Sequence, residues 1–263
     1  MEPFKIATYN VNSIRSRMHI VLPWLKKHSP HVFCMQETKV EDDKFPVEAF
    51  LELGYHVTFR GRKQYNGVAI ASLWAPDDVW YGLNDDADAP DDDRLVCARF
   101  GDLFVLNTYA PQGRDRESEH FTYKLNWFAR LEELIRKTWN PEDRLIWCGD
   151  LNVAPEPIDV YDPKRLLGHV CFNEEVWSAY ERICAWGLKD VFRRHHPGEE
   201  KQYTFYDYRG AANLQRGLGW RIDHLLATEP LYLLSRSCDI DLEPRQAEKP
   251  SDHTILHAEF YEK

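Results

Sequence analysis

A long succession of short apolar runs, with few helix-like segments between them, constrains the fold of this chain most. Runs of about four to eight residues rich in branched and aromatic side chains favour β-strands. So many strands with so few helices between them predict two sheets packed face to face. The expected fold is an α/β four-layer sandwich of two packed mixed β-sheets flanked by helices. The runs cover residues 5–10, 31–36, 55–59, 67–73, 95–100, 103–109, 145–148, 222–227, 238–242 and 254–260.

Helical periodicity is clearest over residues 117–139, where apolar residues recur every three or four positions. Residues 17–28 and 174–186 are two further helix candidates. Ser29-Pro30 and Asn140-Pro141 predict the ends of two of these helices. No low-complexity linker or fixed-period repeat divides the 263 residues, which predicts a single domain over residues 1–263.

The charge balance bears on possible partners. The formal net charge of −10 by itself argues against binding nucleic acid. Much of the negative charge lies in residues 85–93, a segment expected to form a solvated loop. Basic stretches remain at residues 60–63, 193–194 and 209–221. Because a DNA-binding face needs local positive potential and not a positive total, these stretches keep a DNA partner open.

Membrane and disulfide classes are disfavoured. No apolar run approaches the roughly 20 residues that a membrane helix needs, and residues 1–11 resemble a first strand more than a signal sequence. Cys34, Cys97 and Cys148 lie within strand-like runs, and none of the six cysteines forms a CxxC pair. We expect buried thiols in a reducing cytoplasm, with no membrane contact, and neither a zinc site nor a disulfide framework.

Polar side chains gather at the ends of the expected strands. The runs 31–36 and 145–148 lead into Glu37 and Asp150, each of which alone would be interpreted as a turn residue. An ionised Asp223 at the start of an apolar run would be costly to bury without a partner. Side chains held at strand ends suit a functional site because the strands fix them. The remaining members of the set are Asn10, Asn12, Tyr109, Asn152, Asp252 and His253.

These residue types suit hydrolysis at phosphorus. A phosphodiester is anionic, and a hard divalent cation on carboxylate and amide oxygens neutralises that charge. A carboxylate can deprotonate water, and a protonated histidine held by an aspartate can stabilise a non-bridging oxygen. The sequence contains no P-loop, no Gly-x-Ser-x-Gly elbow and no Cys/His spacing that favours zinc.

Six motifs in the family's order, spread over essentially the whole chain, resemble the exonuclease III family of abasic-site (AP) endonucleases, within the DNase I-like endonuclease/exonuclease/phosphatase superfamily. The first motif and the segment after Tyr109 depart modestly from the family, and neither departure removes a reactive group. The motifs are Tyr9-Asn10-Val11-Asn12, Gln36-Glu37-Thr38-Lys39, Tyr65-Asn66-Gly67-Val68-Ala69, Gly149-Asp150-Leu151-Asn152, Trp220-Arg221-Ile222-Asp223-His224 and Ser251-Asp252-His253.

The resemblance implies a role for each matching residue. The implied ligands of Mg²⁺ or Mn²⁺ are Glu37, Asn10, Asn12 and Asp252. The implied catalytic residues are Asp150, which activates water, Asn152 beside it, His253, which binds phosphate, Asp223, which orients that imidazole, and Tyr109. The implied substrate contacts are Gln112, Lys39 and a slot for a flipped-out abasic sugar made by Phe205, Trp220 and Ile222. Core packing is an equally weighted interpretation of the slot aromatics.

The resemblance predicts a magnesium-dependent DNA repair nuclease that acts at abasic sites and 3′ ends. It would combine AP endonuclease, 3′-phosphodiesterase, 3′-phosphatase and 3′→5′ exodeoxyribonuclease activities, as a monomer on double-stranded DNA with abasic sites or blocked 3′ ends. One alternative is a small-molecule or inositol-phosphate phosphatase of the same superfamily, which leaves the aromatic slot unexplained. The other is a non-catalytic DNA-binding relative, which predicts loss of Glu37, Asp150 or His253, and all three are present.

Overall fold

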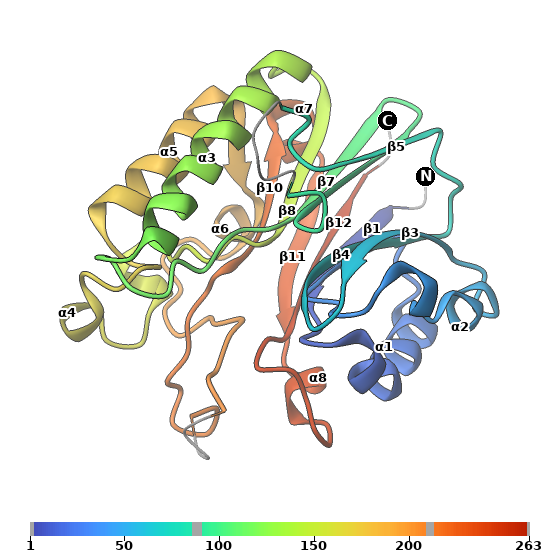
Figure 1. Cartoon of the computed structure of the whole chain (residues 1–263), viewed down its shortest axis with the longest axis horizontal. Helices are drawn as coiled ribbons and strands as arrows, with labels where there is room; N and C mark the ends of the chain where they lie inside the picture. Colours follow the sequence, from blue (N-terminus) through green and yellow to red (C-terminus); the bar gives the residue numbers. More distant parts are fainter. Residues whose placement is uncertain (1–2, 86–90, 209–212, 262–263) are drawn as a thin grey trace.

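The computed structural model describes residues 3–85, 91–208 and 213–261, and within these residues twelve strands form two six-stranded mixed sheets (Figure 1). Sheet A has the strand order β11-β12-β1-β2-β4-β3, and sheet B has the order β5-β6-β7-β8-β10-β9. The strands of sheet A are β1 (Phe4–Asn10), β2 (Val32–Gln36), β3 (His56–Arg62), β4 (Tyr65–Ser72), β11 (Ser235–Asp241) and β12 (Ile255–Phe260). Those of sheet B are β5 (Asp78–Tyr81), β6 (Leu95–Phe100), β7 (Leu103–Tyr109), β8 (Arg144–Asp150), β9 (Leu188–Asp190) and β10 (Asp223–Thr228).

Helices cover the outer face of each sheet (Figure 1). α1 (Ile14–His28) and α2 (Val47–Leu51) pack on sheet A, whereas α3 (Glu119–Thr138) and α5 (Glu174–Gly187) pack on sheet B. The predicted four-layer α/β sandwich is therefore confirmed. No helix of the described residues has the length and apolar content needed to cross a membrane. The short helices are α4 (Pro163–Leu166), α6 (Val191–His195), α7 (Glu229–Tyr232) and α8 (Glu243–Gln246), with 3₁₀ turns at Asp42–Lys44 and Pro157–Asp159.

Parallel strand pairs lie at the centres of both sheets and bring the strand-end residues together. β1 runs parallel to β2 with Asn10 opposite Gln36, and β7 runs parallel to β8 with Tyr109 opposite Asp150. β10 runs antiparallel to β8, so its first residue, Asp223, lies opposite Asp150. The carboxyl ends of the parallel strands and the start of β10 thus meet at one edge of the sandwich. The loops with α4 and α8 protrude at one end of the molecule, and the chain termini lie at the other (Figure 1).

The core divides into apolar layers that match the sheet faces. Side chains from both sheets fill the space between them, and separate clusters join each sheet to its helices. Cys34 and Cys148 lie in the central cluster and Cys97 lies under α3, so their expected burial is confirmed. Because both faces of the central strands are covered, β2 is buried along its whole length, as expected for a strand inside a sandwich.

The expectation that residues 85–93 form a solvated loop is wrong for the end of that segment. Asp91 and Asp93 are only 6% and 3% exposed. Asp91 accepts a hydrogen bond from Arg130 Nη1 of α3 at 2.7 Å, and Asp93 accepts one from Asn66 Nδ2 at 3.0 Å. Buried carboxylates need such partners, and these acids fasten the segment to the body of the protein. Residues 86–90 lie outside the described residues.

Candidate active site

A cavity of about 560 Å³ opens where the strand ends of the two sheets meet. Ten of the residues that the sequence singled out line it, namely Glu37, Tyr109, Gln112, Asp150, Asn152, Phe205, Trp220, Ile222, Asp252 and His253. The other four, Asn10, Asn12, Lys39 and Asp223, hydrogen-bond or ion-pair with one or more of these residues. The structure thus brings the whole predicted set together, although the set spans most of the chain.

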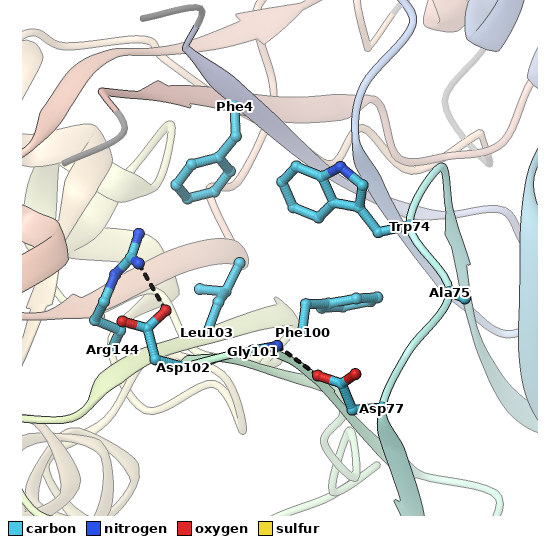
Figure 2. Close-up of a pocket in the computed structure, with 9 residues that line it drawn as sticks. All are labelled: Phe4, Trp74, Ala75, Asp77, Phe100, Gly101, Asp102, Leu103 and Arg144. Atoms are coloured by element: carbon cyan, nitrogen blue, oxygen red, sulfur yellow. Dashed lines mark hydrogen bonds and ion pairs between the residues drawn. The ribbon is translucent and has the colours of Figure 1, made fainter.

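A second cavity of about 370 Å³ lies at the opposite ends of the strands, between Phe4, Trp74 and Phe100 (Figure 2). Its polar groups already pair with one another, since Arg144 Nη1 donates to Asp102 Oδ1 at 2.7 Å. Its lining within the described chain offers no cluster of metal-ligating or acid–base side chains. The strand-end cavity is therefore the candidate active site.

Asn10 joins the two principal carboxylates of the site. Its Nδ2 donates to Glu37 Oε1 at 2.8 Å and to Asp150 Oδ2 at 2.8 Å, while its Oδ1 accepts from the backbone N–H of Asn12 at 3.0 Å. Asn10 is fully buried at the end of β1, so its side chain has little freedom. The amide therefore bridges the acidic residues of sheet A and sheet B. To serve as a metal ligand through Oδ1, it would have to turn over.

Glu37, Asp150 and His253 offer ligand atoms that all lie within 4.8 Å of one another. Burial alone would raise the pKa of Glu37, but the charge of Lys39 and the amide of Asn10 outweigh it and lower that pKa below its ordinary value. Glu37 is therefore an ionised, inward-facing carboxylate. Oxygen ligands of this kind suit a hard divalent cation, so the residues present fit the expected metal.

Lys39 and Asp252 lie on either side of Asn12. Lys39 Nζ contacts Glu37 Oε2 at 2.6 Å and donates to Asn12 Oδ1 at 2.6 Å. Asn12 Nδ2 donates to Asp252 Oδ1 at 3.0 Å. Asp252 is therefore linked to Glu37 through Asn12 and Lys39, and Lys39 contacts two of the expected metal ligands directly.

His253 links two buried acids. Its Nδ1 bonds to Asp223 Oδ2 at 2.8 Å, and its Nε2 lies 3.6 Å from Asp150 Oδ2. Burial would lower the pKa of His253, but Asp223 and Asp150 outweigh it and raise that pKa to about 10. Burial raises the pKa of Asp150 to about 7, with Asp223 and Glu37 adding to the rise and His253 opposing it. The imidazole therefore holds its proton, while Asp150 can exchange one near neutral pH.

Tyr109 and Asn152 complete the polar wall. Burial and the carboxylates of Glu37 and Asp150 raise the pKa of Tyr109, which keeps its hydroxyl protonated and able to donate. Asn152 has φ of 51°, a left-handed conformation that asparagine tolerates better than most residues. Its backbone N–H donates to Asp150 Oδ1 at 3.0 Å and its Nδ2 donates to Ala110 O at 3.0 Å. Asn152 is thus fixed beside Asp150.

The three expected slot residues have one side in the cavity and one in a small apolar cluster. Ile222 is buried at 5% exposure, whereas Phe205 and Trp220 are partly buried and pack on the same cluster. Phe205 and Trp220 pair through an isolated β-bridge. These residues therefore contribute to packing and also line the cavity, and their role as a sugar slot stays a prediction.

Lys124 is a residue that sequence reasoning missed. It lies on the apolar face of α3, three residues after Phe121 and four before Phe128, and it is fully buried. Its Nζ donates to the carbonyls of Asn152 at 2.7 Å, Val170 at 2.7 Å and Gln112 at 3.2 Å. Three segments of the cavity wall are thereby tied to one ammonium group, which uses its three donors for them.

Arg221 of the basic stretches is used inside the protein, whereas Arg62 keeps a side chain that is 61% exposed. Arg221 is fully buried, and its Nε donates to Asp159 Oδ1 at 2.6 Å and its Nη1 to Asp190 Oδ2 at 2.7 Å. Arg62 pairs with Asp93, with 3.2 Å between Nε and Oδ2. Residues 209–212 of the third basic stretch lie outside the described residues. Arg216, in the same stretch, is exposed.

Comparison with known proteins places this geometry in a family. Residues 7–253 match the model of the Endonuclease/Exonuclease/phosphatase family. The chain is 34% identical to exodeoxyribonuclease III of Haemophilus influenzae, over 97% of this chain and 99% of the relative.

Solved structures with similar folds support the same family. An AP endonuclease from Archaeoglobus fulgidus superposes with a TM-score of 0.95 at 54% identity, covering 98% of this chain and 99% of that one. A 3′ phosphatase from Neisseria, bound to a product DNA hairpin, superposes with a TM-score of 0.94 at 37% identity, covering 98% of this chain and 100% of that one. The chain therefore belongs to the endonuclease/exonuclease/phosphatase family and, within it, to the exonuclease III branch of nucleases.

Proposed function

We propose that this chain is a DNA repair nuclease that hydrolyses phosphodiesters at abasic sites and at blocked or ordinary 3′ ends. The observation that carries the proposal is the junction of a carboxylate cluster with an aromatic slot in one cavity, where Phe205 lies 5.0 Å from the ring of His253. Each proposed activity attacks a phosphate next to a deoxyribose 3′ oxygen, so one site can serve them all. Relatives named for exonuclease, AP endonuclease and 3′ phosphatase activities support this range.

We infer that the resident metal is Mg²⁺ or Mn²⁺. Glu37 would be its principal ligand, with Asp150 the nearest second carboxylate and Asn10, Asn12 and Asp252 around it. When bound, the cation would neutralise charge on the phosphate and so lower the barrier to attack by a nucleophile. The ion pair from Lys39 to Glu37 gives a further role to Lys39. It holds Glu37 ionised in the absence of the ion and can move to a phosphate oxygen when substrate enters.

Asp150 would act on the attacking water. A pKa of about 7 lets this carboxylate accept a proton near neutral pH, which is the condition for an effective general base. The backbone N–H of Asn152 holds Asp150 Oδ1, and the amide of Asn10 holds its Oδ2. These two hydrogen bonds orient the carboxylate without consuming all of its lone pairs.

His253 and Tyr109 would stabilise the phosphate. The imidazolium of His253 presents Nε2–H at the cavity while Asp223 holds Nδ1, so positive charge faces the non-bridging oxygens that become more negative during attack. The protonated Tyr109 hydroxyl adds a neutral donor on the sheet B side. Gln112, which is exposed at the same wall, would contact the phosphate backbone.

The aromatic slot would select damaged nucleotides. An abasic nucleotide has no base to unstack, so its sugar can leave the helix at lower cost than a normal nucleotide. Phe205, Trp220 and Ile222 would pack against that sugar. A small-molecule phosphatase would not need this apolar wall to bind its substrate, which is why we favour the nuclease.

The test is a comparison of three duplexes in magnesium. One carries an internal abasic analogue, one a 3′-phosphate at a nick, and one is an undamaged blunt duplex. We expect cleavage of the first two to exceed cleavage of the third by at least tenfold. Hydrolysis of inositol phosphates with no cleavage of any duplex would overturn the proposal. The single catalytic domain, the monomeric state and the cytoplasmic location stay predictions.

A further inference from the structure

Two groups of metal-ligating side chains occur among the described residues. One is the carboxylate cluster of the active site. The other consists of His28, Asp241 and Glu243, whose ligand atoms all lie within 4.8 Å of one another. None of these three residues lines the active-site cavity, and no step proposed above uses them. The second group is therefore separate from the proposed chemistry.

This group forms where three elements meet beside sheet A. His28 is the last residue of α1, Asp241 is the last residue of β11, and Glu243 is the first residue of α8. α8 lies beside α1 (Figure 1), and Lys27 of α1 pairs with Glu243. Because His28 is distant along the chain from the two acids, no local spacing of ligands marks this group in the sequence.

The imidazole of His28 has a nitrogen without a partner. Within the described part of the chain, its Nε2 is buried and makes no hydrogen bond. The Oδ2 of Asp241 lies 3.9 Å from it, which is too far for a hydrogen bond. The ring stacks on the Trp24 indole, with 4.5 Å between centroids and 15° between planes, so its orientation is fixed. A buried polar atom of this kind normally has a partner, and a cation between the imidazole and the carboxylate would supply one.

The two acids differ in how firmly they are held. Asp241 Oδ2 accepts a hydrogen bond from Trp24 Nε1 at 2.8 Å, and its Oδ1 accepts the backbone N–H of Glu243 at 2.9 Å. Outer hydrogen bonds of this kind orient a ligating carboxylate, and each oxygen keeps a lone pair. The side chain of Glu243 is 66% exposed, so it can rotate toward an ion.

We propose that His28, Asp241 and Glu243 bind a Zn²⁺ ion, which joins the end of α1 to the junction of β11 and α8. Tetrahedral Zn²⁺ with bonds of about 2.1 Å places its ligand atoms about 3.4 Å apart. The 3.9 Å between His28 Nε2 and Asp241 Oδ2 is close to that spacing, and rotation of Glu243 brings in the third ligand. An imidazole in the set favours zinc over magnesium, which prefers oxygen ligands.

Lys27 gives the proposal a prediction of opposite sign. Its ammonium group pairs with Glu243 Oε2, so it competes with a metal ion for that carboxylate. Removing the ammonium group would free Glu243 and would also remove a positive charge that repels the ion. Lys27→Ala should therefore strengthen Zn²⁺ binding, whereas loss of a ligand should weaken it.

The experiment is calorimetric titration of Zn²⁺ into the full chain, stripped of metal with EDTA and then held in excess Mg²⁺. We expect the affinity to fall at least about 10-fold in His28→Ala and in Glu243→Gln, because loss of even an outer partner of a metal ligand has an effect of this size. Lys27→Ala should bind more tightly. His19→Ala, which removes another exposed histidine of α1, is the matched control and should bind as the wild type does. Glu37→Ala should also keep the affinity, because it alters only the active-site cluster.

Thermal melts supply a second readout and check that each variant folds. Zn²⁺ should raise the Tm of the wild type and of Lys27→Ala but not that of His28→Ala, because an ion that binds only the folded state stabilises it. Glu243→Gln, at an exposed position, keeps the test decisive if His28→Ala fails to fold. Equal Zn²⁺ affinity in the wild type and Glu243→Gln would overturn the site, as would no binding by the wild type or a loss confined to Glu37→Ala. These readouts do not depend on the proposed nuclease function.

Discussion

Replacing Asp223 by Asn isolates the charge that supports His253. Asp223 is fully buried, and its Oδ2 bonds to His253 Nδ1 at 2.8 Å. Asn keeps the size and shape of the side chain but removes the negative charge. It also presents either a neutral acceptor or an N–H donor to Nδ1, and the donor would force the imidazole into the tautomer without a proton there. In either case the imidazole loses the negative charge that favours its protonated form, so we expect His253 to present less positive charge to the phosphate.

The expected magnitudes separate a chemical effect from a structural one. Disturbing one buried hydrogen-bonded group costs about 1–3 kcal/mol of the free energy of unfolding. Domains of ordinary stability have about 5–15 kcal/mol, so Asp223→Asn should remain folded. Loss of positioned acid–base or charge stabilisation costs about 10²- to 10⁴-fold in rate. A rate loss of that size therefore cannot come from unfolding.

The assay is single-turnover cleavage of an abasic duplex, paired with a thermal melt of each variant. Asp190→Asn is the matched control, because Asp190 is also a partner in a buried ion pair, with Arg221 Nη1 at 2.7 Å, but its side-chain partners within the described residues do not include His253 or another residue of the cavity lining. We expect Asp223→Asn to melt within several degrees of wild type and to lose at least about 10²-fold in rate. The reasoning is refuted if Asp223→Asn cleaves at a near-normal rate, or if Asp190→Asn loses as much turnover per folded molecule.

Further outcomes follow from the same contacts. EDTA should abolish cleavage, and Glu37→Ala should raise the Mg²⁺ concentration needed for half-maximal rate, as a metal titration would show; full activity in EDTA would contradict the metal role. Lys124→Met leaves three buried carbonyls without their hydrogen-bond donor, so the free energy of unfolding measured in urea should fall by roughly 2–5 kcal/mol. The kcat of the folded enzyme should fall too, because the backbone carbonyl of Asn152 loses its hydrogen bond. Burial would raise the pKa of Asp190, but Arg221 outweighs it and holds that pKa below its ordinary value. The loss of unfolding free energy in Asp190→Asn should therefore be large at pH 7 and shrink below about pH 4, where the wild-type carboxylate binds a proton in the unfolded state but not yet in the folded state. A difference in unfolding free energy between the two proteins that stays constant with pH in urea titrations would contradict this.

The sequence was informative wherever a strand is buried on both faces. Runs 95–100 and 103–109 coincide with β6 and β7, and α3 falls within the predicted helix 117–139. β5 and β9 were missed because they are short edge strands that carry charged residues, which dilutes the apolar pattern. The small helices α4, α6, α7 and α8 are too short to show a helical period.

The sequence predicted which residues gather in the candidate site, but not the hydrogen bonds and ion pairs that hold them there. Motif order identified Glu37, Asp150 and His253, because reactive groups at strand ends leave a direct trace in the sequence. Lys124 left a weaker trace, its position on the apolar face of α3 three residues after Phe121, which the count of apolar residues alone passes over. The use of Arg221 as a buried structural cation was hidden, because its partner Asp159 lies 62 residues away along the chain.

The most direct test of the central claim is the rate of the Asp150→Asn variant on a duplex with one internal abasic analogue. Asn at this position keeps the shape of the side chain and can still bond to the backbone of Asn152, so the fold and DNA binding should be retained. It cannot take a proton from water. We predict that a gel-shift assay without metal gives wild-type affinity, while single-turnover cleavage in Mg²⁺ falls by at least about 10²-fold. Near-normal cleavage by Asp150→Asn, with normal binding, would contradict the account.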